Sequence, residues 1–280
     1  MATPRVDPNS GRLVVVAPRR RTRPGAEWAR IAGPNDAELD ECPFCAGREE
    51  RTPPEVFRVE RDGAWVVRVV PNLYPALERQ EVVIHSPRHV RSFADLTDEE
   101  VGAVAAAWQA RLEVARRQGF PVIHPLVNEG AAAGASLPHS HSQLVWLREP
   151  PPERARESPA ALATLLADDE LLVAEQDGVR AVAHRYGRLP YELLVGTVDA
   201  GRLAPALRLL RDCVQRLRAV EGAVPWNAWL HEDHLELVPR VTVLAGLELG
   251  AGIWVNTVAP EEAAEALRRA ADVAAPGACS

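Results

Sequence analysis

The sequence predicts an α+β protein built from a duplicated unit. Both halves of the 280 residues contain, in the same order, a hairpin, a strand, a helix and strands that carry histidines. Each hairpin turn is an Asp-Gly pair, which begins at Asp62 in the first half and at Asp177 in the second. Such repetition indicates two related units, expected at residues 1–150 and 160–280 and joined by the Pro-, Glu- and Arg-rich segment 149–159.

The first half carries the clearest local signals. Thr97 and Glu100 form a capping box, and apolar residues recur every three or four positions until Gly119 ends the helix. The elements expected here are a strand at 13–17, a hairpin at 56–70, a strand at 81–85, a helix at 97–119 and strands at 121–127 and 139–147. In the second half we expect a hairpin at 171–184, a strand at 192–195, a helix from about 200 to 220, strands at 226–231 and 234–238, and a helix from 260 to about 273.

The composition is that of an ordinary globular protein, with 47% hydrophobic and 25% charged residues. No apolar run approaches the roughly 20 residues of a membrane-spanning helix, and the N-terminus lacks the apolar core of a signal peptide. We therefore expect a cytoplasmic protein without a membrane partner. The net charge of −7 argues against nucleic-acid binding, because neutralising phosphates requires a basic surface.

All 32 basic residues are arginines, and the sequence contains no lysine. This excludes Schiff-base chemistry and a Walker A phosphate loop, both of which need lysine. Phosphate recognition must therefore use arginine, backbone N–H groups, hydroxyls or metals. The cluster Arg19, Arg20, Arg21 and Arg23 is either a solvated basic patch or a phosphate clamp, since arginine binds phosphate with two parallel hydrogen bonds.

The stretch from Asn128 to Gln143, NEGAAAGASLPHSHSQ, combines a loop of small residues with two histidines and a glutamine. If residues 139–147 are extended, the side chains of His139, His141 and Gln143 point to one face. This pattern suggests a site that holds an anion close to the backbone. The alternative is a polar edge strand that follows a flexible loop.

His141 is a candidate nucleophile. Imidazole attacks phosphorus well, so a covalent histidine intermediate divides a transfer between two phosphates into two easier displacements. Such a histidine needs a hydrogen bond on its other nitrogen and donors around the phosphorus. Ser136, Gln143 and the backbone of 130–134 could supply those donors. The alternative is a histidine with a purely structural place in the core or at a sheet edge.

The pair Cys42 and Cys45, in CPFC, is a candidate metal-binding motif. Two thiolates and two imidazoles make a closed tetrahedral zinc site, which would be structural. His139 is one candidate imidazole, and His89 or His85 is the other. A redox pair is the alternative, although the thioredoxin-like βαβ context is missing.

A third group comprises His231, His234 and Glu236, with Glu157 on the segment between the halves. Sets of histidine and glutamate bind zinc or iron. The alternative is that these histidines lie on the surface or in the core of the second repeat without a ligand.

Together these residues resemble the active-site motif of the galactose-1-phosphate uridylyltransferases of the histidine triad superfamily, N-x-G-(small)3-G-x-S-x2-H-P-H-x-Q. The resemblance implies that the duplicated unit forms a mixed, mostly antiparallel half-barrel sheet with flanking helices. It also implies that His141 becomes nucleotidylylated, and that Gln143 replaces the last histidine of the hydrolytic triad and contacts the phosphoryl group. The zinc ligands that it implies are Cys42, Cys45, His89 and His139.

The remaining positions implied by the resemblance bind substrate or a second metal. The substrate-binding positions are the arginine pair Arg20 and Arg23, Asn72 near the nucleotide, Asn128, Gly134 and Ser136 near phosphate, and Glu248 near sugar hydroxyls. The second metal site, for iron or zinc, corresponds to Glu157, His231 and His234, with Glu236 in place of a histidine. Members of this family are commonly dimers, so a homodimer is a further expectation.

The departures from the family pattern point toward one branch. Ser140 stands where the motif has its middle proline. The segments 72–77 (NLYPAL) and 246–256 (GLELGAGIWVN) resemble the ADP-glucose phosphorylases. The lysine and tyrosine that contact the sugar phosphate in typical uridylyltransferases are replaced by Thr242 and Leu247, which argues against galactose 1-phosphate as the acceptor.

The leading hypothesis is a nucleotidylyltransferase that moves an NMP group from a nucleotide sugar to a sugar 1-phosphate through nucleotidyl-His141, as UDP-glucose–hexose-1-phosphate uridylyltransferases do. One alternative is an ADP-sugar phosphorylase, whose acceptor is inorganic phosphate. Another is a non-catalytic, zinc-stabilised nucleotide-binding module. Gln143 in place of a third histidine argues against hydrolysis, because a general acid is missing at that position.

Overall fold

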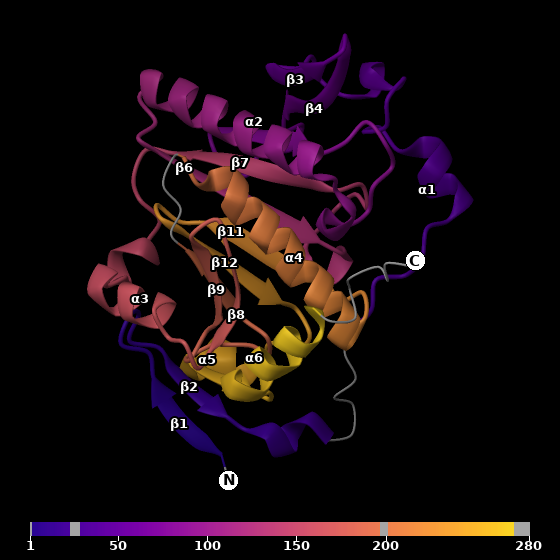
Figure 1. Ribbon diagram of the computed structural model, residues 1–280. Coiled ribbons are helices and arrows are strands. Elements are labelled where there is room, and N and C mark those ends of the chain that lie inside the picture. The colour runs from indigo at the N-terminus through magenta and orange to yellow at the C-terminus, as the bar shows by residue number, and fades with distance from the viewer. Residues whose placement is uncertain (1, 23–28, 197–200, 272–280) are drawn as a thin grey trace.

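The computed structural model describes residues 2–22, 29–196 and 201–271. These residues form a ten-stranded sheet, a three-stranded sheet and helices that cover them (Figure 1). The fold is α+β with a duplicated unit, as the sequence predicts. Its large sheet is mostly antiparallel and open, in agreement with the half-barrel that the family resemblance implies.

The first half of the chain contributes five neighbouring strands of the large sheet. They are β3 (Phe57–Arg61), β4 (Ala64–Pro71), β5 (Arg79–Ile84), β6 (Val122–Glu129) and β7 (His141–Leu147). Their spatial order is β3-β4-β5-β7-β6, and every pairing is antiparallel. The strand β7, which bears His141, therefore lies between β5 and β6.

The second half repeats this arrangement in reverse order across the sheet. Its strands are β8 (Leu172–Gln176), β9 (Val179–Ala183), β10 (Leu193–Gly196), β11 (Trp226–Leu230) and β12 (His234–Pro239). They follow β6 in the order β11-β12-β10-β9-β8. The pairing of β6 with β11, antiparallel with Asn128 opposite Asn227, joins the two halves into one continuous sheet.

Local sequence signals explain the main elements. Asp62 and Gly63 have φ angles of 51° and 79°, and Asp177 has 52° with Gly178 at 73°, so both hairpins turn through the left-handed conformation that the Asp-Gly pairs predict. The helix α2 (Asp98–Arg117) begins with the predicted capping box of Thr97.

The face of the large sheet under the long helices holds the main core. The helices α2, α4 (Leu203–Glu221) and α6 (Pro260–Arg269) lie on it, with α2 against α4 and α4 against α6 (Figure 1). Trp108, Trp146 and Trp226 are fully buried in a single hydrophobic cluster that draws on both halves. Within the described chain, no helix combines the length and the apolar character needed to cross a membrane.

Two small apolar clusters cover parts of the opposite face of the large sheet, one toward each end. At the first end, Cys42, Phe44, Val70 and Ile84 form a small cluster. At the other end, the short helix α3 (Pro159–Leu166) packs on β9 and β10. Between them lies the stretch of β5, β7, β6, β11 and β12 that carries the candidate site.

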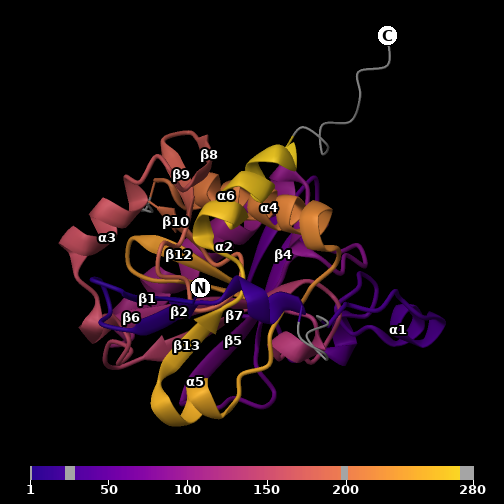
Figure 2. The ribbon, with the colours of Figure 1, turned by 90° about the horizontal axis from the view of Figure 1, so that it is seen from below.

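A three-stranded sheet lies at the end of the molecule opposite β3 and β4, nearest the viewer in Figure 2. It comprises β1 (Thr3–Val6), β2 (Leu13–Val16) and β13 (Ile253–Asn256). The sequence predicts only β2 of these, because β13 pairs in parallel with a strand from the other end of the chain. The remaining short helices are α1 (Asp36–Glu41), α5 (Gly246–Ala251) and the 3₁₀ helices η1 (Pro18–Thr22), η2 (Glu49–Arg51), η3 (Phe93–Asp95), η4 (Ala131–Ala133) and η5 (Arg154–Arg156).

Candidate active site

His141 is the first residue of β7 and is only 5% exposed. Its Nδ1 lies 2.7 Å from the backbone oxygen of His139. Because a carbonyl oxygen only accepts, Nδ1 carries the hydrogen and Nε2 keeps its lone pair. Burial lowers the pKa of His141, which keeps the ring neutral. The ring is thus prepared as a nucleophile at Nε2.

Alternation along the strands places two amides on the same face as His141. Gln143 follows it by two residues on β7, and Leu126 of β6 pairs with Gln143. Asn128, two residues after Leu126, therefore shares this face. The strand begins at His141, however, so the expectation that 139–147 is extended throughout is wrong. His139 precedes the strand and turns toward the cysteines, which separates the two histidines.

The loop between β6 and β7 depends on two glycines. Gly130 and Gly134 have φ angles of 85° and 89°, in the region that favours glycine. A Cβ on Gly130 would also lie 3.0 Å from Ile31 and 3.1 Å from Pro225. Three N–H groups of this loop bond to carbonyls within it, from Ala133, Gly134 and Ala135. The loop backbone therefore offers fewer free donors than the sequence suggests, while Ser136 is exposed.

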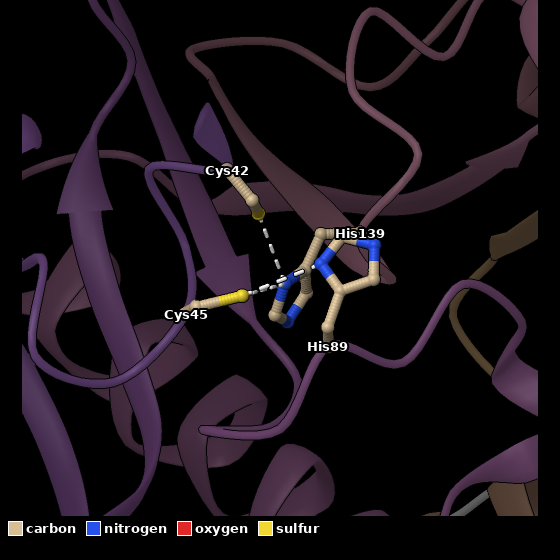
Figure 3. A group of neighbouring side chains, drawn as sticks. All are labelled: Cys42, Cys45, His89 and His139. Atoms are coloured by element: carbon tan, nitrogen blue, oxygen red, sulfur yellow. Dashed lines mark hydrogen bonds between the residues drawn. The ribbon is translucent and has the colours of Figure 1, made fainter. Parts of the chain in front are cut away.

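The four candidate zinc ligands lie together (Figure 3). One potential ligand atom from each of Cys42, Cys45, His89 and His139 falls within 4.8 Å of the others. The Sγ of Cys42 is 3.4 Å from Nδ1 of His139, and the Sγ of Cys45 is 3.3 Å from Nδ1 of His89. Two ligands of one tetrahedral zinc ion, at bonds of about 2.3 and 2.0 Å, are ~3.6 Å apart. The residues fit a structural zinc ion.

Hydrogen bonds on the Nε2 atoms of His139 and His89 orient the Nδ1 atoms of both rings toward the thiols. Nε2 of His139 lies 3.0 Å from the backbone oxygen of Ser86, and Nε2 of His89 lies 2.9 Å from a carboxylate oxygen of Glu38. Each Nε2 therefore donates, which leaves Nδ1 as the ligand atom. Burial and the neighbouring Cys42 thiol raise the pKa of Cys45 to about 11. A bound cation would reverse this effect, because metals bind thiolates.

A second cluster on the open face joins Glu157, His231, His234 and Glu236. His231 lies between the two carboxylates, with Nδ1 3.0 Å from Glu157 and Nε2 3.6 Å from Glu236. Burial opposes its protonation, but hydrogen bonds and charges of these carboxylates prevail and raise the pKa of His231 to about 9. Nε2 of His234 is buried without a partner in the described structure, as an unfilled ligand position would be.

An arginine contacts the second cluster. Arg188 forms ion pairs with Glu236 and Glu192, so one carboxylate is already neutralised by a guanidinium. The donor set of two carboxylates and two imidazoles fits zinc or iron, with Arg188 competing for Glu236.

The remaining predicted substrate-binding residues lie in separate segments. Arg20 is exposed on η1, and Arg23 lies outside the described residues. Asn72 follows β4, where its Oδ1 accepts a hydrogen bond from the N–H of Tyr74. Glu248 caps its own helix α5 through the N–H of Ala245. No contact within the described ranges joins Arg20 or Glu248 to His141.

Two amides that the sequence reasoning did not single out contact the predicted ones. The Nε2 of Gln80 donates to Oε1 of Gln143, and Nδ2 of Asn227 donates to Oδ1 of Asn128 at 2.7 Å. The predicted strands include Asn227 but begin one residue after Gln80, which the structure places in β5. Alternation is the only sequence signal for the side chains that face the site. It cannot show which strands are neighbours.

The model of the family described as "Galactose-1-phosphate uridyl transferase, N-terminal domain" matches residues 73–151, which include the loop, His141 and Gln143. The chain is also 27% identical to an ADP-glucose phosphorylase of Arabidopsis thaliana over 94% of its own length and 92% of the relative. The chain is therefore similar to the galactose-1-phosphate uridylyltransferase family. Features of the ADP-glucose phosphorylase branch of this family extend along nearly the whole chain.

Two further comparisons show similarity to the galactose-1-phosphate uridylyltransferase family and to its ADP-glucose phosphorylase branch. A uridylyltransferase of Streptomyces lividans is 35% identical, over 38% of this chain and 29% of that protein. The crystal structure of the Arabidopsis thaliana ADP-glucose phosphorylase with bound ADP-glucose has a TM-score of 0.81, with 27% identity over 96% of this chain and 98% of that one. At the level of the family, the activity is nucleotidyl transfer.

Proposed function

We propose that this chain transfers a nucleotidyl group from a nucleotide sugar to a phosphate acceptor through a covalent intermediate on His141. The observation that carries the proposal is the hydrogen bond from Nδ1 of His141 to the backbone oxygen of His139, because it leaves Nε2 as a neutral nucleophile. The amides of Gln143 and Asn128 share its face and supply donors for phosphoryl oxygens.

The reaction proceeds by two displacements at the α-phosphorus. Nε2 attacks this phosphorus, and the bond to the bridging oxygen breaks, so hexose 1-phosphate leaves with the electron pair. An oxygen of the acceptor phosphate then attacks the same phosphorus, and the bond to Nε2 breaks. Since Gln143 carries no proton that it could transfer, water gains no general acid or base there.

We infer that the chain is an ADP-sugar phosphorylase, with inorganic phosphate as the acceptor. The alternative reading from the sequence thus becomes the preferred one. Its support is the similarity to ADP-glucose phosphorylase over nearly the whole of both chains, together with Thr242 and Leu247 at the positions expected for the sugar-phosphate lysine and tyrosine. The similarity to the uridylyltransferase covers a minor part of that relative and does not discriminate between the acceptors.

The proposed zinc ion would be structural, held by Cys42, Cys45, His89 and His139. It would tie the segment before η2 to the residues that precede β7, and so fix the backbone oxygen that orients His141. The iron or zinc at Glu157, His231 and His234, the homodimer and the cytoplasmic location stay predictions.

The covalent intermediate is tested with ADP-glucose labelled in its adenylyl group, without acceptor and with an alkaline quench. Wild type is expected to retain an acid-labile label, and His141→Gly to retain none, because the phosphorus–nitrogen bond forms only on that ring. His124→Asn is the matched control, since His124 lies on β6 and shares the face of Asn128. A wild-type chain that takes no label from ADP-glucose or UDP-glucose contradicts the covalent route.

The acceptor is identified by adding a second substrate to the labelled enzyme. Inorganic phosphate is expected to release the label as ADP, whereas galactose 1-phosphate and water release little. Release by a hexose 1-phosphate and not by phosphate would instead establish the uridylyltransferase type of reaction.

A further inference from the structure

We propose that Gln80 and Asn227 are positioning residues, which hold the side-chain amides of Gln143 and Asn128 with their N–H groups toward the substrate phosphates. The inference rests on the proposed function and adds to it two residues outside the family motif. It follows from hydrogen bonds whose direction is fixed by chemistry, because a backbone N–H or a guanidinium only donates and a carbonyl only accepts.

The orientation of Gln143 is set from the side of β5. The backbone N–H of Ala76 donates to Oε1 of Gln80 at 3.0 Å, so the oxygen of this amide must lie at that end. The NH₂ end of Gln80 is then directed at Oε1 of Gln143 and donates to it. Gln143 consequently turns its own NH₂ group away from β5.

The orientation of Asn128 is set from the side of β11. A guanidinium nitrogen of Arg240 donates to Oδ1 of Asn227 at 3.2 Å, and Nδ2 of Asn227 donates to the backbone oxygen of Ala133 at 2.8 Å. Two partners of opposite kind therefore fix the amide of Asn227. Its Nδ2 also donates to Oδ1 of Asn128, 2.7 Å away, which leaves the NH₂ group of Asn128 free.

The four amides lie on four neighbouring strands of the sheet. Its order here is β5-β7-β6-β11, so the inner strands carry Gln143 and Asn128 and the outer strands carry Gln80 and Asn227. Asn227 lies directly opposite Asn128, and Gln80 is the diagonal neighbour of Gln143. In the described ranges, neither Nε2 of Gln143 nor Nδ2 of Asn128 has a hydrogen-bond partner, so both remain available.

The orientation matters because the two ends of an amide act oppositely on an anion. An N–H group stabilises the negative oxygens of the α-phosphoryl group in the transition state, whereas a C=O group repels them. The two ends are nearly equal in shape, so sterics alone cannot choose between them. Hydrogen bonds from the neighbouring strands make this choice before the substrate arrives.

The test uses Gln80→Glu and Asn227→Asp, which keep the shape of each side chain. Glu still accepts from the N–H of Ala76, but it presents oxygen to Gln143, which must then rotate and direct its own oxygen at the phosphates. We expect the rate of label formation from ADP-glucose on His141 in a single turnover to fall by about 100-fold for Gln80→Glu, the loss of one well-placed donor. Asn227→Asp is expected to have a comparable effect through Asn128.

A double-mutant cycle separates orientation from the added negative charge and from folding. In a Gln143→Met background no amide remains to be turned, so Gln80→Glu should change the rate by no more than about twofold. The matched cycle combines Asn227→Asp with Asn128→Leu. Reactions are followed over hours, so that slow backgrounds remain measurable, and circular dichroism confirms that each variant is folded.

The outcomes are distinct. Equal losses in both backgrounds, or rates for both single variants like that of wild type, overturn the inference while leaving the nucleotidyl transfer intact. A wild-type chain that forms no label removes the proposed function, and this inference with it.

Discussion

At the residue scale, Ser140 lies between the two histidines for which we propose different functions, His139 as a zinc ligand and His141 as the nucleophile. Its N–H donates to the backbone oxygen of Val90 at 2.6 Å, and its Oγ lies 2.9 Å from Nδ1 of the buried His85. The family pattern has proline at this position, and proline lacks the N–H group. Ser140 is therefore part of the local structure that separates His139, beside the cysteines, from His141 on β7.

We predict that Ser140→Pro destabilises this chain although proline is the family residue. It removes the donor to the oxygen of Val90, which is buried, and the contact with His85, at a cost of about 1–3 kcal/mol. Ser140→Ala loses only the hydroxyl and should cost about 1 kcal/mol. Urea unfolding of the two variants at matched metal content measures both values. A proline variant as stable as wild type would show that the N–H of Ser140 is dispensable.

The sequence predicts individual residues well where chemistry alone restricts the choice. Cys42 and Cys45 are separated by two residues and soft metal ligands are few, so their grouping with His139 can be inferred without a structure. Gln80 and Asn227 are polar residues on strands, and any of several such residues could face Gln143. Their role depends on strand order and register, which residue type does not specify.

At the scale of elements, the segment that carries Cys42 and Cys45 has little regular structure of its own. Its helix α1 has no buried residue, and the small cluster around Phe44 is the apolar contact that holds it to β4 and β5. The other two candidate zinc ligands, His89 and His139, belong to segments outside this one. The metal would thus replace the packing that a short irregular segment cannot provide.

We predict about one zinc ion per chain, and its loss in Cys42→Ser with several kcal/mol of stability, since structural zinc contributes directly to folding. Metal analysis and thermal unfolding, with and without chelator, measure the two effects. Cys213→Ser is the control, because Cys213 is buried in α4 within the main core and is not among the clustered ligands. A metal-free wild type with unchanged stability would contradict a structural zinc site.

The elements that neighbouring residues specify are predicted correctly from the sequence. Elements that depend on distant partners are not. The hairpins at Asp62 and Asp177 and the capped helix α2 are each specified by neighbouring residues. In contrast, β13 is a strand because Trp254 and Val255 pair in parallel with Val14 and Val15 of β2. No residue near position 254 indicates that this segment pairs with a strand at the opposite end of the chain. The sequence analysis therefore misses β13, and it also misses β1, which pairs with the other edge of β2.

At the scale of the whole molecule, we propose that 1–150 and 160–280 are repeats of one structure rather than separately folding domains. The strands β6 and β11 pair across the boundary, and α2 packs on α4. Further hydrogen bonds cross the boundary: Arg211 donates to the backbone oxygen of Leu96 at 2.9 Å, and Gln215 to that of Ala94 at 2.8 Å. One hydrophobic cluster spans both halves.

We therefore predict that the chain unfolds in one cooperative transition and that neither half folds alone. A separated half would expose the ladder edge of β6 or β11 and the apolar surface around Trp108 or Trp226, and unpaired strand edges promote aggregation. Tryptophan fluorescence and far-ultraviolet circular dichroism should give coincident urea midpoints for the full chain. Fragments 1–150 and 160–280 should be insoluble when expressed separately and soluble when co-expressed, because pairing of β6 with β11 restores the sheet. Two separate midpoints, or a stable isolated half with dispersed amide resonances, would establish independent domains and place the duplicated units in separate cores.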